Sequence, residues 1–198
     1  MPADDAHAVR AAADALRALR APWAIAGGWA LDLALGRVTR AHADVDVAVF
    51  RDDQDALRAA LPDWHLDAVV DGRLVPWMPG TRLELPVHEL HARPPAGRGE
   101  PPLELLLNER DATDWVYRRD AAVRLPLARA IRDVGGGLRA LAPEVVLLYK
   151  SKAPRAADDR DFRAAQPLLD AEGRAWLQAA LVRAAPAHPW AAALAADE

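Results

Sequence analysis

The chain of 198 residues contains no cysteine. This absence excludes disulfide bonds, thiolate metal ligands and a cysteine nucleophile. No apolar run approaches the roughly 20 residues that a membrane-spanning helix needs. The stretch 1–20 interleaves Asp, His and Arg with Ala, so it lacks the apolar run of a secretory signal peptide. We therefore expect a cytoplasmic protein with no membrane partner.

Lysine is scarce as well. Of the 25 cationic side chains 23 are arginine, and the two lysines are Lys150 and Lys152. The formal net charge is -4 and the pI is about 5.9, which argues against a general nucleic-acid-binding protein. The same acidic balance suits a cleft that serves a metal ion or a cationic substrate.

The spacing of apolar residues predicts strands and helices mixed over the first two thirds of the chain, followed by helices alone. This pattern favours an α+β fold with an α/β-type mixed sheet. We expect an N-terminal lobe over 1–134 and a helical C-terminal lobe over 135–198, with the change at Gly135–Gly137. The expected helices are 5–20, 29–35, 52–61, 143–152, 158–169 and 171–184, and the expected strands are 44–50, 64–70, 73–77, 82–91, 103–108 and 115–117.

Two carboxylates alternate with valines in the expected strand 44–50. On a strand, Asp44 and Asp46 point to the same face with Cα atoms roughly 6.5–7 Å apart, and the valines line the opposite face. Side-by-side carboxylates repel each other unless a cation lies between them, and Mg²⁺ is the hard ion they prefer. A solvated surface pair is the alternative interpretation.

A third acid lies on the expected strand 103–108. Glu104 shares a face with Leu106 and Asn108, among leucines that make an unpartnered carboxylate costly. The alternative is an edge-strand glutamate that reaches solvent. Glu84 and Glu89 are the other candidates for a third acid.

Two glycines lie between the apolar run 23–26 and the helix 29–35. Gly27 and Gly28 would let the backbone approach a ligand, and the start of the following helix favours phosphate. A tight strand-to-helix turn is the alternative. The sequence has no Walker A motif and no G-x-G-x-x-G motif, so it supports neither a P-loop nor a Rossmann nucleotide site.

These stretches resemble a known family. IAGGWALD at 25–32 and GRVTRAHADVD at 36–46 are similar to the nucleotidyltransferases related to aminoglycoside 2''-nucleotidyltransferase, which belong to the DNA polymerase β-like superfamily. Their motif is a Gly-Gly or Gly-Ser turn followed by Asp-x-Asp on a strand. The stretches 143–150 and 155–162 resemble the helical segment of the same group.

The resemblance implies a nucleotidyltransferase-fold N-terminal catalytic domain with three carboxylates, and a helical domain that closes over a nucleotide. Asp44 and Asp46 match the metal-binding pair. Glu104 matches the third acid by strand order and alternation, where relatives often carry Asp. The implied cofactor is Mg²⁺, as two ions held by these three side chains, and Glu104 could also act as general base.

The same resemblance implies the nucleotide-binding residues. Gly27 and Gly28 match the turn that receives the triphosphate, and Arg40 and His42 match the stretch that enters the metal strand. Lys150 is expected to face the nucleotide. Lys152 follows it by two positions on a helix, so it should face roughly 200° away and stay in solvent. We also interpret Arg118–Arg119 as a solvated pair.

The implied function is the transfer of an NMP group, with AMP from ATP expected, to a hydroxyl of a small molecule. An aminoglycoside-like antibiotic, and hence antibiotic resistance, is the acceptor that the analogy suggests. One alternative is a toxin-type nucleotidyltransferase that modifies a protein or tRNA, which the acidic pI disfavours. The other is a degenerate, non-catalytic NTP-binding module, which would gain support if Glu104 pointed away from Asp44 and Asp46.

Overall fold

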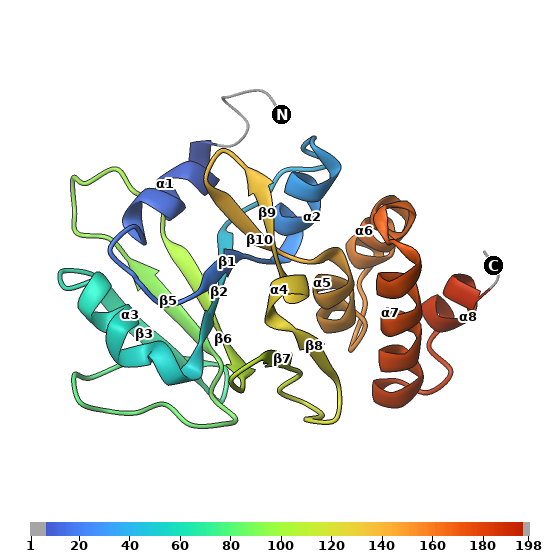
Figure 1. Ribbon diagram of the computed structural model, residues 1–198. Coiled ribbons are helices and arrows are strands. Elements are labelled where there is room, and N and C mark those ends of the chain that lie inside the picture. Colours follow the sequence, from blue (N-terminus) through green and yellow to red (C-terminus); the bar gives the residue numbers. More distant parts are fainter. Residues whose placement is uncertain (1–6, 196–198) are drawn as a thin grey trace.

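The structure, a computed structural model, describes residues 7–195. In this range ten strands form one connected sheet: β1 (Trp23–Ile25), β2 (Val45–Phe50), β3 (His65–Val70), β4 (Arg73–Pro76), β5 (Glu89–Arg93), β6 (Leu103–Arg110), β7 (Asp114–Val116), β8 (Arg124–Pro126), β9 (Ile131–Gly135) and β10 (Leu138–Leu141). The strand order is β4-β3-β5-β6-β2-β1-β10-β9, and β7 pairs with β6 and β8 (Figure 1). The sheet is mixed, because β2 is parallel to β6 and β1 to β10 while the other pairs are antiparallel.

The helices of the described residues pack around this sheet. They are α1 (His7–Ala15), α2 (Gly27–Leu35), α3 (Gln54–Ala60), α4 (Leu127–Ala130), α5 (Pro143–Lys150), α6 (Ala156–Ala165), α7 (Ala171–Ala184) and α8 (Pro189–Ala195), with 3₁₀ turns η1 (Arg51–Asp53) and η2 (Gln166–Leu168). The helices after Pro143 gather on one side of the sheet, on the right in Figure 1. Helix α2 contacts β2, α5 and α6, so it joins the sheet to this helical group. None of the helices is long and apolar enough to cross a membrane.

The centre of the sheet is β2. Its valines are at most 1% exposed, which agrees with the alternation of valine and carboxylate in the sequence. In the parallel register with β6, Asp46 lies opposite Glu104 and Phe50 lies opposite Asn108. This pairing places polar side chains from two distant parts of the chain side by side.

Most expected elements are present, and the predicted mixed α/β class is confirmed. Helix α2 begins at Gly27, two residues earlier than expected, and Gly36 ends it with φ 68° in the left-handed conformation. Residues 5 and 6 of the first expected helix lie outside the described range.

Two expectations about the secondary structure are wrong. Residues 138–141, which were expected to belong to the helical lobe, form the strand β10, because the left-handed Gly135–Gly137 turn returns the chain to the sheet, where β10 pairs with β1. The all-helical part therefore begins at Pro143. The expected strand 82–91 is a strand only from Glu89 onward.

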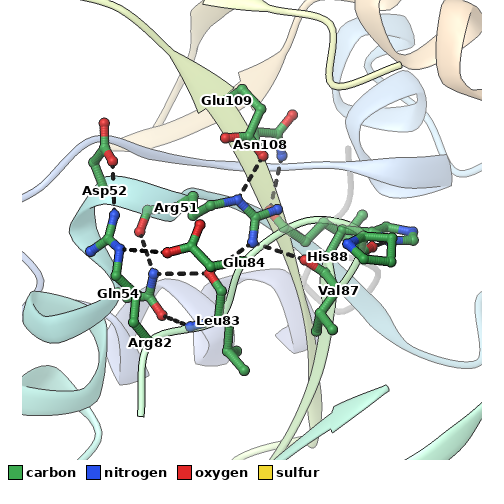
Figure 2. Close-up of polar contacts among 12 residues, drawn as sticks. Arg51, Asp52, Gln54, Arg82, Leu83, Glu84, Val87, His88, Asn108 and Glu109 are labelled. Atoms are coloured by element: carbon green, nitrogen blue, oxygen red, sulfur yellow. Dashed lines mark hydrogen bonds and ion pairs between the residues drawn. The ribbon is translucent and has the colours of Figure 1, made fainter. Parts of the chain in front are cut away.

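The segment before β5 is held by a buried arginine instead of by strand pairing. Arg51, 5% exposed, donates hydrogen bonds to the carbonyls of Leu83 (3.1 Å) and Val87 (2.8 Å) and to Oε1 of Glu109 (2.8 Å). The Gln54 side chain accepts a hydrogen bond from the Leu83 backbone N–H at 2.7 Å. Figure 2 shows how these contacts fix the chain just ahead of His88.

Candidate active site

Three carboxylates meet where the parallel strands β2 and β6 begin. Asp46 and Glu104 are register partners, and Asp44 lies directly before the first residue of β2. The side chain of Glu104 lies close enough to Asp44 and Asp46 for each pair to share a proton. The structure thus brings together the three acids that the sequence singled out, although Asp44 precedes the strand.

The protonation of these acids reflects their crowding. Burial, followed by the charges of Asp44, Asp46 and Glu89, raises the pKa of Glu104 to about 7. Burial and the charge of Asp44 also raise the pKa of Asp46, while Lys150 acts in the opposite direction. A bound cation would offset the repulsion between these carboxylates and favour their deprotonated forms. Their oxygens are ligands that suit Mg²⁺.

The other two candidates for the third acid have different positions. Glu84 is exposed and pairs with Arg82 at 3.2 Å. Glu89 lies on β5, next to β6, and raises the pKa of both Asp46 and Glu104. Ligand atoms of Glu89, His91 and Glu104 all lie within 4.8 Å of one another. The sequence signal for this group was the Glu-x-His alternation on the expected strand.

The two glycines form the wall opposite Asp46. Gly27 has φ 58°, and a Cβ atom added there would overlap Oδ2 of Asp46. A Cβ atom at Gly28 would lie 2.5 Å from Nη2 of Arg40 and 2.5 Å from Cε1 of His42. Glycine is therefore required at both positions for this close approach of backbone to side chains. The same contacts place Arg40 and His42 at the start of α2.

His42 was expected to bind the nucleotide, but it is not among the residues that line the cavity. Its side chain is 4% exposed, and Nε2 lies 2.6 Å from Oδ2 of Asp32. Asp32, itself 1% exposed, also accepts hydrogen bonds from the backbone N–H (3.1 Å) and the hydroxyl (2.6 Å) of Thr39. The Trp29 ring lies 4.5 Å from the His42 ring. Nε1 of Trp29 donates a hydrogen bond to the backbone carbonyl of Asp44. His42 and Asp32 thus position the loop that carries Asp44, and the sequence gave no separate role to Asp32.

Lys150 lies close enough to Asp46 to affect its pKa, as expected for a residue of this site. Its Nζ lies 2.6 Å from Oδ1 of Asp158 and 3.0 Å from Oδ2 of Asp161. Nη2 of Arg40 lies 3.5 Å from the same oxygen of Asp161. Two aspartates of α6 therefore hold the two predicted phosphate-binding cations beside the carboxylate group.

A cavity of about 450 Å³ extends from Gly27 and Asp46. Both Lys150 and Lys152 line it, so the expectation that only one lysine can face the cleft is wrong. The physical reason is that α5 ends at Lys150, after which helical spacing no longer sets directions. Arg118 and Arg119 line the cavity too. Arg119 is exposed, as expected for a solvated residue, whereas Arg118 is half-buried. Nothing in the local sequence around these arginines signalled this position.

Residues 8–80 match the family described as aminoglycoside-2''-adenylyltransferase. The crystal structure of ANT(2'')-Ia in complex with adenylyl-2''-tobramycin aligns with TM-score 0.60 and 19% identity, over 91% of this chain and 98% of that one. The lincomycin-bound lincosamide antibiotic adenylyltransferase LnuA aligns with TM-score 0.56 and 14% identity, over 82% and 96%. No curated protein matches the sequence significantly.

The chain has a nucleotidyltransferase fold. The solution structure of ANT(2'')-Ia, with TM-score 0.61 and 20% identity, covers 100% of this chain and has the same arrangement. The predicted resemblance and fold class are confirmed, and the predicted enzyme class, nucleotidyltransferase, agrees with the family match. In this nucleotidyltransferase fold the matched residues 8–80 include Gly27, Gly28, Asp44 and Asp46.

Proposed function

We propose that the chain is a metal-dependent nucleotidyltransferase that transfers AMP from ATP to a hydroxyl group of a small molecule. The observation that carries the proposal is the group Asp44, Asp46 and Glu104, held together by two neighbouring strands beside the Gly27–Gly28 turn. The family match and the fold support the same chemistry. The proposal rests on the carboxylate group, the family match and the fold together.

The residues present fit a hard divalent cation. Asp44, Asp46 and Glu104 supply carboxylate oxygens, and Glu104 carries a pKa raised to about 7 first by burial and then by its acidic neighbours. We propose that these side chains hold Mg²⁺, as two ions. When bound, the metal would neutralise phosphate charge and favour the deprotonated form of an acceptor hydroxyl.

The chain's own groups would bind the triphosphate. The glycine turn lets the backbone at the start of α2 approach Asp46 and Arg40 closely, and there backbone N–H groups and the helix dipole favour negative charge. Lys150 and Arg40 lie on the α6 side of this turn and would offset the charge of the pyrophosphate that leaves. Asp158 and Asp161 keep these cations in place.

The acceptor hydroxyl would attack the α-phosphorus. A new P–O bond forms to the acceptor oxygen, and the bond between the α-phosphorus and the oxygen leading to the β-phosphate breaks to release pyrophosphate. We propose that the proton passes to a carboxylate oxygen of Glu104, which lies opposite Asp46 in the strand register. The side chain of Glu104 lies near Asp44 and Asp46, which supports a catalytic site over a non-catalytic NTP-binding module.

The proposal is tested in two stages. The first measures Mg²⁺-dependent binding of a non-hydrolysable ATP analogue, which needs no acceptor. The second incubates the protein with each of the four NTPs, Mg²⁺ and a panel of hydroxylated acceptors that includes tobramycin and lincomycin, and follows pyrophosphate release. We expect a preference for ATP, and a loss of at least about a hundredfold in Asp44→Asn and Asp46→Asn. Undiminished transfer in Asp44→Asn, or no Mg²⁺-dependent binding of any nucleotide, would overturn the assignment.

A further inference from the structure

The cavity has a second end along β6. Glu104 and Asn108 lie four residues apart on the same face of this strand, so their Cα atoms are about 13 Å apart. Asn108 lines the cavity, and its register partner is Phe50 at the far end of β2. Asp46 lines the cavity as well, so the cavity extends from this member of the carboxylate group toward a region that the proposed metal and triphosphate do not occupy.

Two arginines lie at this second end. The guanidinium carbons of Arg118 and Arg119 lie 5.7 Å and 5.5 Å from the centre of the Tyr149 ring. Nη1 of Arg119 donates a hydrogen bond to the hydroxyl of Tyr117 at 2.9 Å. Within residues 7–195, neither arginine forms an ion pair with a carboxylate. The cavity thus contains two guanidinium groups whose charge is not offset.

Two acids in this region already have partners. Glu109 accepts a hydrogen bond from buried Arg51 at 2.8 Å, and Oε1 of Glu89 lies 3.0 Å from Nε2 of His91. Burial lowers the pKa of Arg118, and the positive charges of Arg119 and Arg51 lower it further. A polycationic molecule in this part of the cavity would meet repulsion from the arginines, whereas an anion would be attracted.

The floor below the arginines is rigid. Oδ1 of Asn108 accepts hydrogen bonds from Nε1 of Trp115 (2.9 Å) and from the hydroxyl of Tyr149 (3.1 Å). Nδ2 of Asn108 donates to the carbonyl of Leu106 at 2.9 Å. Each polar group of Asn108 is therefore satisfied, and the Tyr149 ring under the guanidinium groups is fixed. Such a site loses little side-chain entropy when it binds a ligand.

Resting on the nucleotidyl-transfer function above, we propose that the acceptor carries an anionic group, a phosphate or carboxylate, which Arg118 and Arg119 bind. Guanidinium groups bind both anions with paired hydrogen bonds. The acceptor hydroxyl would then lie near Glu104, roughly 10 Å from the anionic group. The acceptor class is a hydroxylated small anion, such as a sugar phosphate or sugar acid, and not a polycationic aminoglycoside.

The arginines are assigned to the acceptor because the nucleotide has its own cations. Lys150 and Arg155 act on Asp46, and Arg40 contacts Gly28. By contrast, Arg118 and Arg119 lie against the Tyr149 ring at the other end of the cavity. The two groups of cations thus flank different parts of one elongated cavity.

The test is calorimetric binding to protein saturated with Mg²⁺ and the non-hydrolysable ATP analogue. The probes are ribose 5-phosphate, gluconate, uncharged ribose and tobramycin. We expect at least one of the two anionic probes to bind with an affinity at least tenfold higher than ribose or tobramycin. Arg118→Ala and the milder Arg118→Gln should weaken that binding at least tenfold and leave affinity for the ATP analogue unchanged. Arg163→Ala, which removes an exposed arginine of α6, should bind the probe as wild type does.

Three outcomes would overturn the proposal: neither anionic probe binds better than ribose, tobramycin binds best, or the Arg118 variants weaken the ATP analogue instead of the probe. Circular dichroism of both Arg118 variants distinguishes a local effect from misfolding, and if neither folds, the comparison among the four probes on wild type decides. Failure of the proposed function would be recognised separately, because then the ATP analogue itself would not bind.

Discussion

His42 and Asp32 form a buried pair, with Nε2 of the imidazole 2.6 Å from Oδ2 of the carboxylate. The pair ties the C-terminal part of α2 to the loop that leads into β2, and that loop also contains Asp44. A histidine at this place in the sequence suggested contact with a nucleotide. Its side chain instead controls where a carboxylate lies.

If His42 acts by positioning Asp44, His42→Ala should lower kcat and weaken Mg²⁺ binding, with a smaller change in the KM for ATP. Asp32→Ala should have the same effect and should cost about 2–4 kcal/mol of unfolding free energy, since it leaves buried partners without a hydrogen bond. Because both residues act through one loop, the losses in kcat should not add in the double variant. Additive losses, or an effect on KM alone, would contradict this role.

Gly27 and Gly36 provide a matched pair of substitutions. Both have positive φ, but a Cβ atom at Gly27 would overlap Asp46 whereas the space around Gly36 is open. Either alanine should cost about 1 kcal/mol of stability through backbone strain. Gly27→Ala should in addition abolish Mg²⁺-dependent nucleotide binding, while Gly36→Ala retains it. Thermal unfolding and analogue titration on both variants measure the two effects, and equal binding would show that Asp46 can move aside.

The third acid is identified by three conservative variants. Glu104→Gln should reduce transfer and Mg²⁺ affinity by at least about tenfold, because its carboxylate contacts Asp44 and Asp46. Glu89→Gln should have an intermediate effect through its charge, and the exposed Glu84→Gln should have none. If Glu89→Gln reduced transfer and Mg²⁺ affinity the most, Glu89 on β5 would replace Glu104 as the third proposed metal ligand.

The contact between Lys150 and Asp158 predicts a pH dependence of stability. Burial alone would raise the pKa of Asp158, but hydrogen bonds from Lys150 and from the backbone N–H of Arg155 lower it to about 2. A carboxyl whose pKa is lower in the folded state stabilises the protein above its unfolded pKa near 4, and this contribution is lost as pH falls from about 4 to about 2. Urea unfolding should therefore show Asp158→Asn to be less stable than wild type at pH 7, with a smaller difference at pH 3. A difference that does not shrink toward acid would contradict the lowered pKa.

Arg51 should be a stability determinant rather than a ligand. Arg51→Met removes three hydrogen bonds and leaves Glu109 without its partner, which should cost about 3–5 kcal/mol. Arg82→Met is the matched control, because this arginine is half exposed and its two ion pairs are on the surface, so its loss should cost less than about 1 kcal/mol. Urea midpoints of both variants give the comparison, and similar midpoints would mean that Arg51 does not hold the segment before β5.

Local patterns were sufficient for the parts of the fold that depend on neighbours in the sequence. The valine alternation of β2, the αL glycine after α2 and the order of strands and helices all follow from periodicity and backbone preference. The strand β10 was missed because four residues after a glycine turn carry little periodicity of their own. Its pairing with β1, far away in the sequence, decides its conformation.

Some residues of the candidate site could also be proposed from the sequence, whereas others were placed only by the structure. Asp44, Asp46, Glu104, Gly27 and Gly28 could be proposed from the sequence, because strand alternation and glycine content are local properties. The position of His42 against Asp32, the entry of Lys152 into the cavity and the exposure of Arg118 and Arg119 to its interior could not. Each depends on where a helix ends or on which distant strand packs alongside, and these are properties of the assembled fold.

Thus the sequence by itself indicated which carboxylates and which turn form the candidate site, because residues two apart in an extended segment point to the same side of the chain. It also placed its two lysines in one short segment. Only the tertiary structure decided which cations face the cavity and which are paired with carboxylates. The direction of a long side chain is set by its packing partners, and these come from parts of the chain that the sequence alone does not bring together.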